Sequence, residues 1–129
     1  MEKFVTYQQA VALKEIGYDK YSWFGMECSL YKADGKHTFY ANGIGDETYI
    51  SAPLKSEAFQ WFRKEHNIQS YIYPRTIEGY KNGRIFTNYI YTIKPLYGNN
   101  YIESDGFESY EEAEPACIDK LIEIVKNNF

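Results

Sequence analysis

Few cysteines and histidines occur in this sequence, which limits the metal and disulfide chemistry that it can support. The 129 residues include two cysteines, Cys28 and Cys117, and two histidines, His37 and His66. A small secreted domain usually carries more cysteines in a disulfide framework, and a zinc site needs clustered ligands. The two cysteines form no CxxC pair, and the histidines are far apart in the sequence. We therefore expect no metal and no cofactor, and we expect both thiols to be buried and inert.

Long apolar runs are absent as well. No apolar stretch approaches the length of about 18 residues that marks a candidate membrane span. The segment from Met1 to Ala12 mixes polar and apolar side chains and lacks the apolar core of a signal peptide. These absences predict a cytoplasmic protein that does not contact a membrane. A chain of this length fits a single domain over residues 1–129.

Catalytic arrangements are also missing. Nucleophilic catalysis needs a Ser or Cys beside a base and an orienting group, and neither histidine has a recognisable catalytic setting. No pair of carboxylates stands out, and Gly43-Ile44-Gly45 lacks the third Gly and the Lys of a phosphate loop. The sequence therefore predicts that the protein is not an enzyme. A cleft that holds His37 or His66 within hydrogen-bond reach of Cys, Ser, Asp or Glu would contradict this prediction.

What the sequence does contain is a clear set of helix signals. Thr6 and Gln9 form a capping box, in which each side chain can bond the backbone amide of the other residue. Gly17 suits the left-handed conformation that ends a helix, so we expect a helix over 7–16. Pro53 fits the first turn of a second helix, and Asn67 is a suitable end for it. The apolar stripe of this second helix consists of Leu54, Ala58, Trp61 and Phe62.

A third helix is expected from Ser109 to Lys126. Ser109-Tyr110-Glu111-Glu112 repeats the capping pattern of the first helix. Pro115 lies inside this segment, so we expect a kink or a late helical start. The stripe that would be buried consists of Cys117, Leu121, Ile124 and Val125.

Two hairpins are expected between the helices. Asp34-Gly35 is typical of a two-residue turn, and such a turn places Leu30 opposite Phe39 and Cys28 opposite Ala41, with Leu30, Phe39 and Cys28 facing inward. Asn82-Gly83 predicts a second two-residue turn.

In the second hairpin, Pro74 makes the strand over 71–81 an edge strand or an interrupted one.

The expected helices and strands follow one another along the chain in the order α-ββ-α-ββ-α. We predict an α+β fold with about three helices and an antiparallel sheet built from the two hairpins, covered by helices on one side.

Three segments carry a resemblance to known proteins. They are Phe4-Val5-Thr6-Tyr7-Gln8-Gln9-Ala10, the segment from Ala52-Pro53-Leu54 to Trp61-Phe62-Arg63, and the segment from Tyr110-Glu111-Glu112 to Ile122-Glu123-Ile124. They resemble a group of small uncharacterised proteins of bacteriophages and mobile elements of gut bacteria. The resemblance implies an accessory role and supplies no catalytic residues. Pro115 stands where the group is expected to have Leu.

Charge and aromatic residues are unevenly spread. Residues 55–94 carry seven Lys and Arg against three Asp and Glu, whereas residues 95–129 carry two against eight. Tyrosine is frequent, with 14 residues. Basic and aromatic residues alternate in hairpin 71–94, a combination used to bind single-stranded nucleic acid. The candidate binding residues in this hairpin are Tyr71, Tyr73, Arg75, Tyr80, Lys81, Arg84, Tyr89 and Tyr91.

Two functions remain after these exclusions. Tyrosine and tryptophan contribute much of the energy at protein interfaces, and a surface with both charges can steer a partner. We therefore expect a non-enzymatic protein-interaction module whose partner is another protein or a second copy of the chain. The alternative is single-stranded nucleic-acid binding through hairpin 71–94, which the net charge of −4 disfavours.

Overall fold

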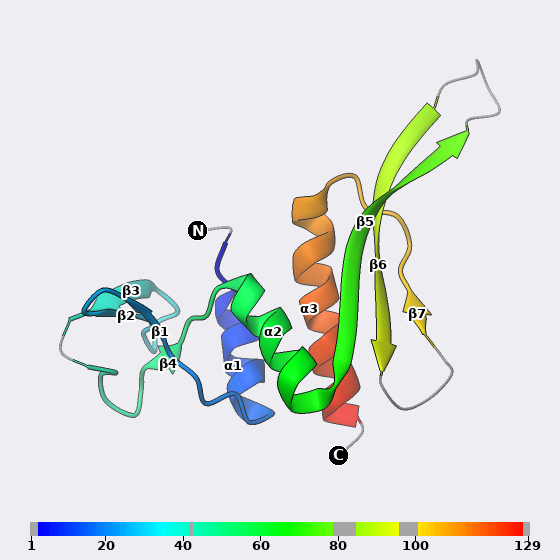
Figure 1. Cartoon of the computed structure of the whole chain (residues 1–129). Coiled ribbons are helices and arrows are strands. Elements are labelled where there is room, and N and C mark those ends of the chain that lie inside the picture. Colours follow the sequence, from blue (N-terminus) through cyan, green and yellow to red (C-terminus); the bar gives the residue numbers. More distant parts are fainter. Residues whose placement is uncertain (1–2, 42, 79–84, 96–100, 128–129) are drawn as a thin grey trace.

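The protein has three helices and two antiparallel sheets in a computed structural model, which describes residues 3–41, 43–78, 85–95 and 101–127. Figure 1 shows their arrangement. The elements are α1 (Tyr7–Glu15), β1 (Ser22–Phe24), β2 (Glu27–Tyr31), β3 (His37–Tyr40), β4 (Ile50–Ser51), α2 (Lys55–His66), β5 (Ile68–Glu78), β6 (Ile85–Pro95), β7 (Ile102–Glu103) and α3 (Tyr110–Asn127). The predicted α+β class and element order are confirmed. The two hairpins do not share the one sheet that the sequence predicts, because each pairs with different short strands and lies in a sheet of its own.

Helix α1 begins and ends as its sequence predicts. The Thr6 hydroxyl accepts from the Gln9 amide at 3.1 Å, and the Gln9 side chain accepts from the Thr6 amide at 3.0 Å. At the other end Gly17 has a φ of 104°, and the Tyr18 amide donates to the Leu13 carbonyl at 2.9 Å. Leu13 is fully buried, so the helix is both capped and anchored.

The turn of the first hairpin differs from the prediction. The Gly35 amide donates to the Lys32 carbonyl, and the Lys32 amide donates to the Lys36 carbonyl, both at 2.9 Å. The loop therefore has three residues, a tight turn followed by a left-handed Gly35 with a φ of 85°. Asp34 needs no positive φ in this loop and accepts from the Lys36 amide instead.

The longer loop shifts the register by one residue. Cys28 pairs with Tyr40, and Leu30 pairs with Thr38. Because side chains alternate along a strand, a shift of β3 by one residue against β2 places Phe39 opposite Ser29, on the other face from Cys28 and Leu30. Phe39 was predicted to point inward, and this is wrong because its side chain is 44% exposed. Cys28 and Leu30 are fully buried, as predicted.

Helix α2 begins at Lys55, so Pro53 lies just before the helix rather than in its first turn. The Glu57 carboxylate accepts from the Leu54 amide at 2.9 Å at this end. Asn67 ends the helix in the left-handed conformation with a φ of 55°, as predicted.

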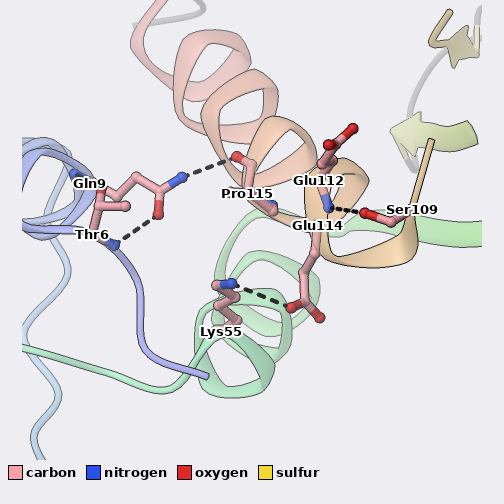
Figure 2. Close-up of polar contacts among 7 residues, drawn as sticks. All are labelled: Thr6, Gln9, Lys55, Ser109, Glu112, Glu114 and Pro115. Carbon is pink, nitrogen blue, oxygen red and sulfur yellow. Dashed lines mark hydrogen bonds and ion pairs between the residues drawn. The ribbon is translucent and has the colours of Figure 1, made fainter. Parts of the chain in front are cut away.

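Helix α3 runs through Pro115 without a late start. The Ser109 hydroxyl accepts from the Glu112 amide at 3.2 Å, which caps the helix at the expected residue. The Pro115 carbonyl accepts a hydrogen bond from the Gln9 side chain at 2.9 Å (Figure 2). Proline removes one backbone bond of the helix, and Gln9 ties the same segment to α1.

One core joins the helices to the second sheet. Its fully buried side chains come from all parts of the chain and include Val5, Leu13, Phe62, Ile93, Ile118 and Leu121. Across the described part of the chain, no helix has the length and apolar character needed to cross a membrane.

Candidate binding surfaces

The second sheet is built around a long hairpin. Strands β5 and β6 pair over their full length, from Ile68 opposite Pro95 to Glu78 opposite Ile85. Helices α2 and α3 pack against one side of this hairpin, and its far part extends beyond the N-terminal end of α3 (Figure 1). Within the described sheet β5 is an edge strand, as predicted.

Pro74 does not interrupt β5. It lies opposite Tyr89, whose amide and carbonyl bond the backbone of Phe107 at 2.9 and 2.7 Å. Those groups of Tyr89 therefore point away from β5, and Pro74 and Tyr89 form a pair without ladder hydrogen bonds. The proline nitrogen faces the free edge of the sheet, where no donor is needed.

Three of the predicted binding residues share one face of β5. Tyr71, Tyr73 and Arg75 alternate with Ser70 and Ile72, which line a pocket against α2 and α3. The three side chains therefore point to the face without helices. Tyr71 is 58% exposed and Tyr73 is 40% exposed. We call these three residues the β5 stripe.

The middle of this face, on β6, is less open than its two edges, where Arg75 and Glu103 are both partly exposed. Ile90 on β6 lies directly opposite Tyr73 and is only 1% exposed. The segment after β7 also approaches β6 closely, since a side chain at Gly106 would collide with Asn88. A partner on this face would therefore meet the β5 stripe first.

Two other predicted residues lie on the helix side of the sheet. The Tyr91 ring stacks on Phe107 with centroids 6.1 Å apart, and the Tyr89 ring meets Tyr110 at 6.4 Å. Burial raises the pKa of Tyr91 above its ordinary value. These two tyrosines pack the sheet against neighbouring segments and are separated from the β5 stripe. Tyr80, Lys81, Arg84 and the predicted Asn82-Gly83 turn lie outside the described residues.

Arg75 has an acidic neighbour within its own sheet. Its guanidinium lies 3.5 Å from the Glu103 carboxylate, which comes from β7 on the other side of β6. Both side chains are partly exposed. This ion pair neutralises part of the positive charge that the sequence places on the hairpin.

Sequence reasoning missed an apolar patch on the first sheet. Phe24 and Phe39 are exposed on the same face, with ring centroids 5.5 Å apart, and Met26 is exposed at the β1–β2 turn. Trp23 is also exposed, but as the neighbour of Phe24 in β1 it points to the other face. The exposure of Phe39 follows from the one-residue register shift. The large apolar residues around the β1–β2 turn are visible in the sequence and could have suggested this patch. The local sequence does not show, however, that their side chains stay outside the core.

A groove lies where α1 and α3 begin. It has a volume of about 590 Å³ and is bordered by the tip of the first hairpin at Gly35 and by Lys55 at the start of α2. The Lys55 ammonium lies 3.6 Å from the Glu114 carboxylate (Figure 2). Sequence spacing could not predict this groove, because its walls come from four separate segments.

His37 lies within hydrogen-bond reach of a serine. Its Nε2 is 2.7 Å from Ser29 Oγ. The Ser29 hydroxyl donates to the Ala52 carbonyl at 2.7 Å, so the His37 N–H donates to Ser29 and does not act as a base toward it. Ser29 is fully buried. This pair joins β2, β3 and the segment before α2, and the His37 side chain is partly exposed.

Acid should weaken the fold through His37. Burial is the main cause that holds the pKa of His37 below its ordinary value of 6.5. A depressed histidine pKa stabilises the fold above pH 6.5, and this contribution is lost as the pH falls below 6.5 because the unfolded chain then binds more protons.

We expect the unfolding free energy of the unchanged protein to fall more steeply from pH 7 to pH 5 than that of His37→Asn. Urea titrations at several pH values measure both slopes. If the unfolding free energies of the two proteins fall equally with pH, the pKa of His37 is the same in the folded and unfolded chain.

The cysteines fit the expectation of inert thiols. Both are fully buried and free, and burial raises the pKa of Cys28 and raises that of Cys117 to about 12. Within residues 3–41, 43–78, 85–95 and 101–127, no three His, Cys, Asp or Glu side chains are grouped so that they could hold a metal ion.

Comparisons of the chain with protein-family models, with curated proteins and with solved structures found no match.

Proposed function

We propose that the chain is a non-enzymatic protein-binding module that contacts its partner through the β5 stripe. The observation that carries this proposal is the pair of exposed tyrosines, Tyr71 and Tyr73, held two residues apart on a fully paired strand. A tyrosine offers an apolar ring and a hydroxyl group to a partner, and the paired backbone reduces the entropy that binding would cost.

The partner is another protein or a second copy of this chain. A cytoplasmic location and an accessory role in a bacteriophage or mobile element belong to the same proposal, and they rest on the sequence alone. The ion pair between Arg75 and Glu103 supports a protein partner, since an interface of mixed charge suits protein surfaces better than phosphates.

Binding of single-stranded nucleic acid is the second candidate. Tyr71, Tyr73 and Arg75 follow one another on the same face, so two rings for base stacking lie beside a cation for a phosphate. The net charge of −4 and the acidic neighbour of Arg75 count against this candidate.

The test replaces Tyr71 and Tyr73 with Thr, which keeps a good strand former at both positions. Purified protein is used to capture partners from bacterial lysate with and without nuclease treatment, and light scattering measures self-association. We expect the double variant to lose at least about tenfold in affinity for the captured protein, or for its second copy, because exposed tyrosines are frequent energetic centres of interfaces. Tyr21→Thr is the matched control, since Tyr21 is also 40% exposed but lies beside the first sheet.

Two outcomes contradict the proposal. Equal binding by the double variant would place the interface elsewhere. Retention that disappears with nuclease and falls steeply with salt would favour nucleic acid, and replacement of Arg75, Lys81 and Arg84 with Glu should then abolish it.

A further inference from the structure

The free edge of β5 carries backbone groups that no other strand of the described chain pairs. Tyr89 bonds Phe107 with both its amide and its carbonyl, so the opposite residue, Pro74, also turns its backbone groups away from the β5–β6 ladder. The direction of hydrogen bonding alternates along a strand, so the amides and carbonyls of Ser70 and Ile72 face the free edge as well. An extended strand is the structure whose backbone matches such a row of donors and acceptors.

A pocket lies beside this edge, on the side of the sheet that α2 and α3 cover (Figure 1). It has a volume of about 240 Å³, and its walls include Phe59, Arg63, Ser70, Ile72, Tyr110 and Glu114. This volume is below the range of about 300–1,000 Å³ that is usual for small-molecule pockets, so the pocket suits a single side chain. Residues that lie opposite each other in a strand pair share a face of the sheet. A strand paired with Ser70 and Ile72 would therefore direct alternate side chains toward this pocket.

The pocket has a positive charge to offer. Glu114 is already paired with Lys55 at 3.6 Å, whereas Arg63 takes part in no ion pair with any described residue. Arg63 is exposed in the last turn of α2, where a cation also suits the helix dipole. An acidic side chain in the pocket would form a charge-assisted contact with the Arg63 guanidinium.

We infer that the partner adds a short extended segment to the free edge of β5 and places an acidic side chain in the pocket beside Arg63. Pro74 limits the length of this segment, because it offers no donor at the edge. Pro74 also disfavours a second copy as the occupant, since antiparallel pairing of two copies along β5 would bring two prolines into the ladder. The inference rests on the proposed function, because it describes how the same partner binds at β5.

Fluorescence anisotropy of a labelled Gly-Thr-Val-Glu-Val-Thr-Gly peptide tests the strand pairing. In the inferred pairing the peptide Glu points to the pocket, and its two Val side chains lie toward Tyr71 and Tyr73. We expect this peptide to bind, and we expect N-methylation of its Glu to weaken binding at least about tenfold, because the N–H that bonds β5 is replaced by a methyl group. N-methylation of the Val that follows is the matched control, since that N–H points away from β5.

Two variants of the protein test the pocket. Arg63→Gln should weaken binding of the Glu peptide at least about fivefold, because the charge-assisted contact is lost. The same variant should bind a peptide with Gln in place of Glu as well as the unchanged protein does. Lys64→Gln is the matched control, since it removes the same charge from the next exposed residue of α2, which does not line the pocket.

Amide hydrogen exchange of the unchanged protein locates the paired strand. The amides of Ser70 and Ile72 should gain protection when the Glu peptide binds, while those of Tyr71 and Tyr73, which face β6, should not change.

The inference is overturned if the Glu peptide does not bind, if the two N-methylated peptides bind equally, or if Arg63→Gln binds as Lys64→Gln does. It is also overturned if Ile72 is protected without peptide in a dimer that light scattering detects, because a second copy would then occupy the edge. Tyr71→Thr/Tyr73→Thr separates this inference from the proposed function. If that variant keeps its affinity while N-methylation of the peptide Glu abolishes binding, the stripe is contradicted and the strand pairing is supported.

Discussion

Replacement of Phe62 with Ala is expected to lower the free energy of unfolding by about 4 kcal/mol. Phe62 is fully buried in α2, and its ring packs on Trp61 with centroids 5.1 Å apart. The substitution removes the ring and leaves a cavity that the surrounding helices can fill only in part. Because domains are commonly stable by about 5–15 kcal/mol, this loss should leave a large unfolded fraction at moderate temperature.

Urea unfolding followed by circular dichroism measures this loss. Phe39→Ala is the control, since the same substitution at a 44% exposed side chain on the first sheet should cost much less. A cost for Phe62→Ala no greater than that for Phe39→Ala would mean that the core does not pack around α2 as described.

Removal of the Glu114 carboxylate should have the second-largest effect. The Lys55 side chain is only 9% exposed and the Glu114 side chain is 21% exposed. Glu114→Ala leaves the Lys55 ammonium buried without its partner, which commonly costs about 3–5 kcal/mol for a fully buried pair. Because Glu114 is partly exposed, solvent screens the pair, and we expect about 2 kcal/mol.

A second ion pair on α3 supplies the control. Lys120 and Glu123 lie 3.4 Å apart, but both side chains are more exposed, so Glu123→Ala should cost less than about 1 kcal/mol. Replacement of both partners by Lys55→Met and Glu114→Leu should recover most of the stability lost in Glu114→Ala, because no unpaired charge then stays buried. If the double variant is as unstable as Glu114→Ala, the loss comes from packing and not from charge.

Only part of the candidate surfaces could be predicted from the sequence. The sequence predicted Tyr71, Tyr73 and Arg75 as binding residues, and these three do share one face of β5. Frequent tyrosines suggested a binding surface, but composition could not say which rings stay outside. Tyr89 and Tyr91 meet Tyr110 and Phe107, which are distant in the sequence.

Local chemistry determined the helix boundaries of this protein. The capping box of Thr6 and Gln9, the left-handed Asn67 and the cap at Ser109 all involve atoms within a few residues of each other. Such contacts form in the same way in most folds, so the sequence alone predicts them.

Tertiary structure decided the rest. A three-residue turn and a two-residue turn are both compatible with Asp34-Gly35, and the choice moved Phe39 out of the core. Pro115 was expected to delay the start of α3 or kink it, but the helix starts at Tyr110 and continues through Pro115. The side chain of Gln9, more than one hundred positions earlier, lies against this segment and donates to the Pro115 carbonyl. The groove where α1 and α3 begin likewise takes its walls from four separate segments, which include Tyr7, Gly35 and Lys55. These features depend on contacts between distant segments, and only packing of the whole chain establishes which of those contacts form.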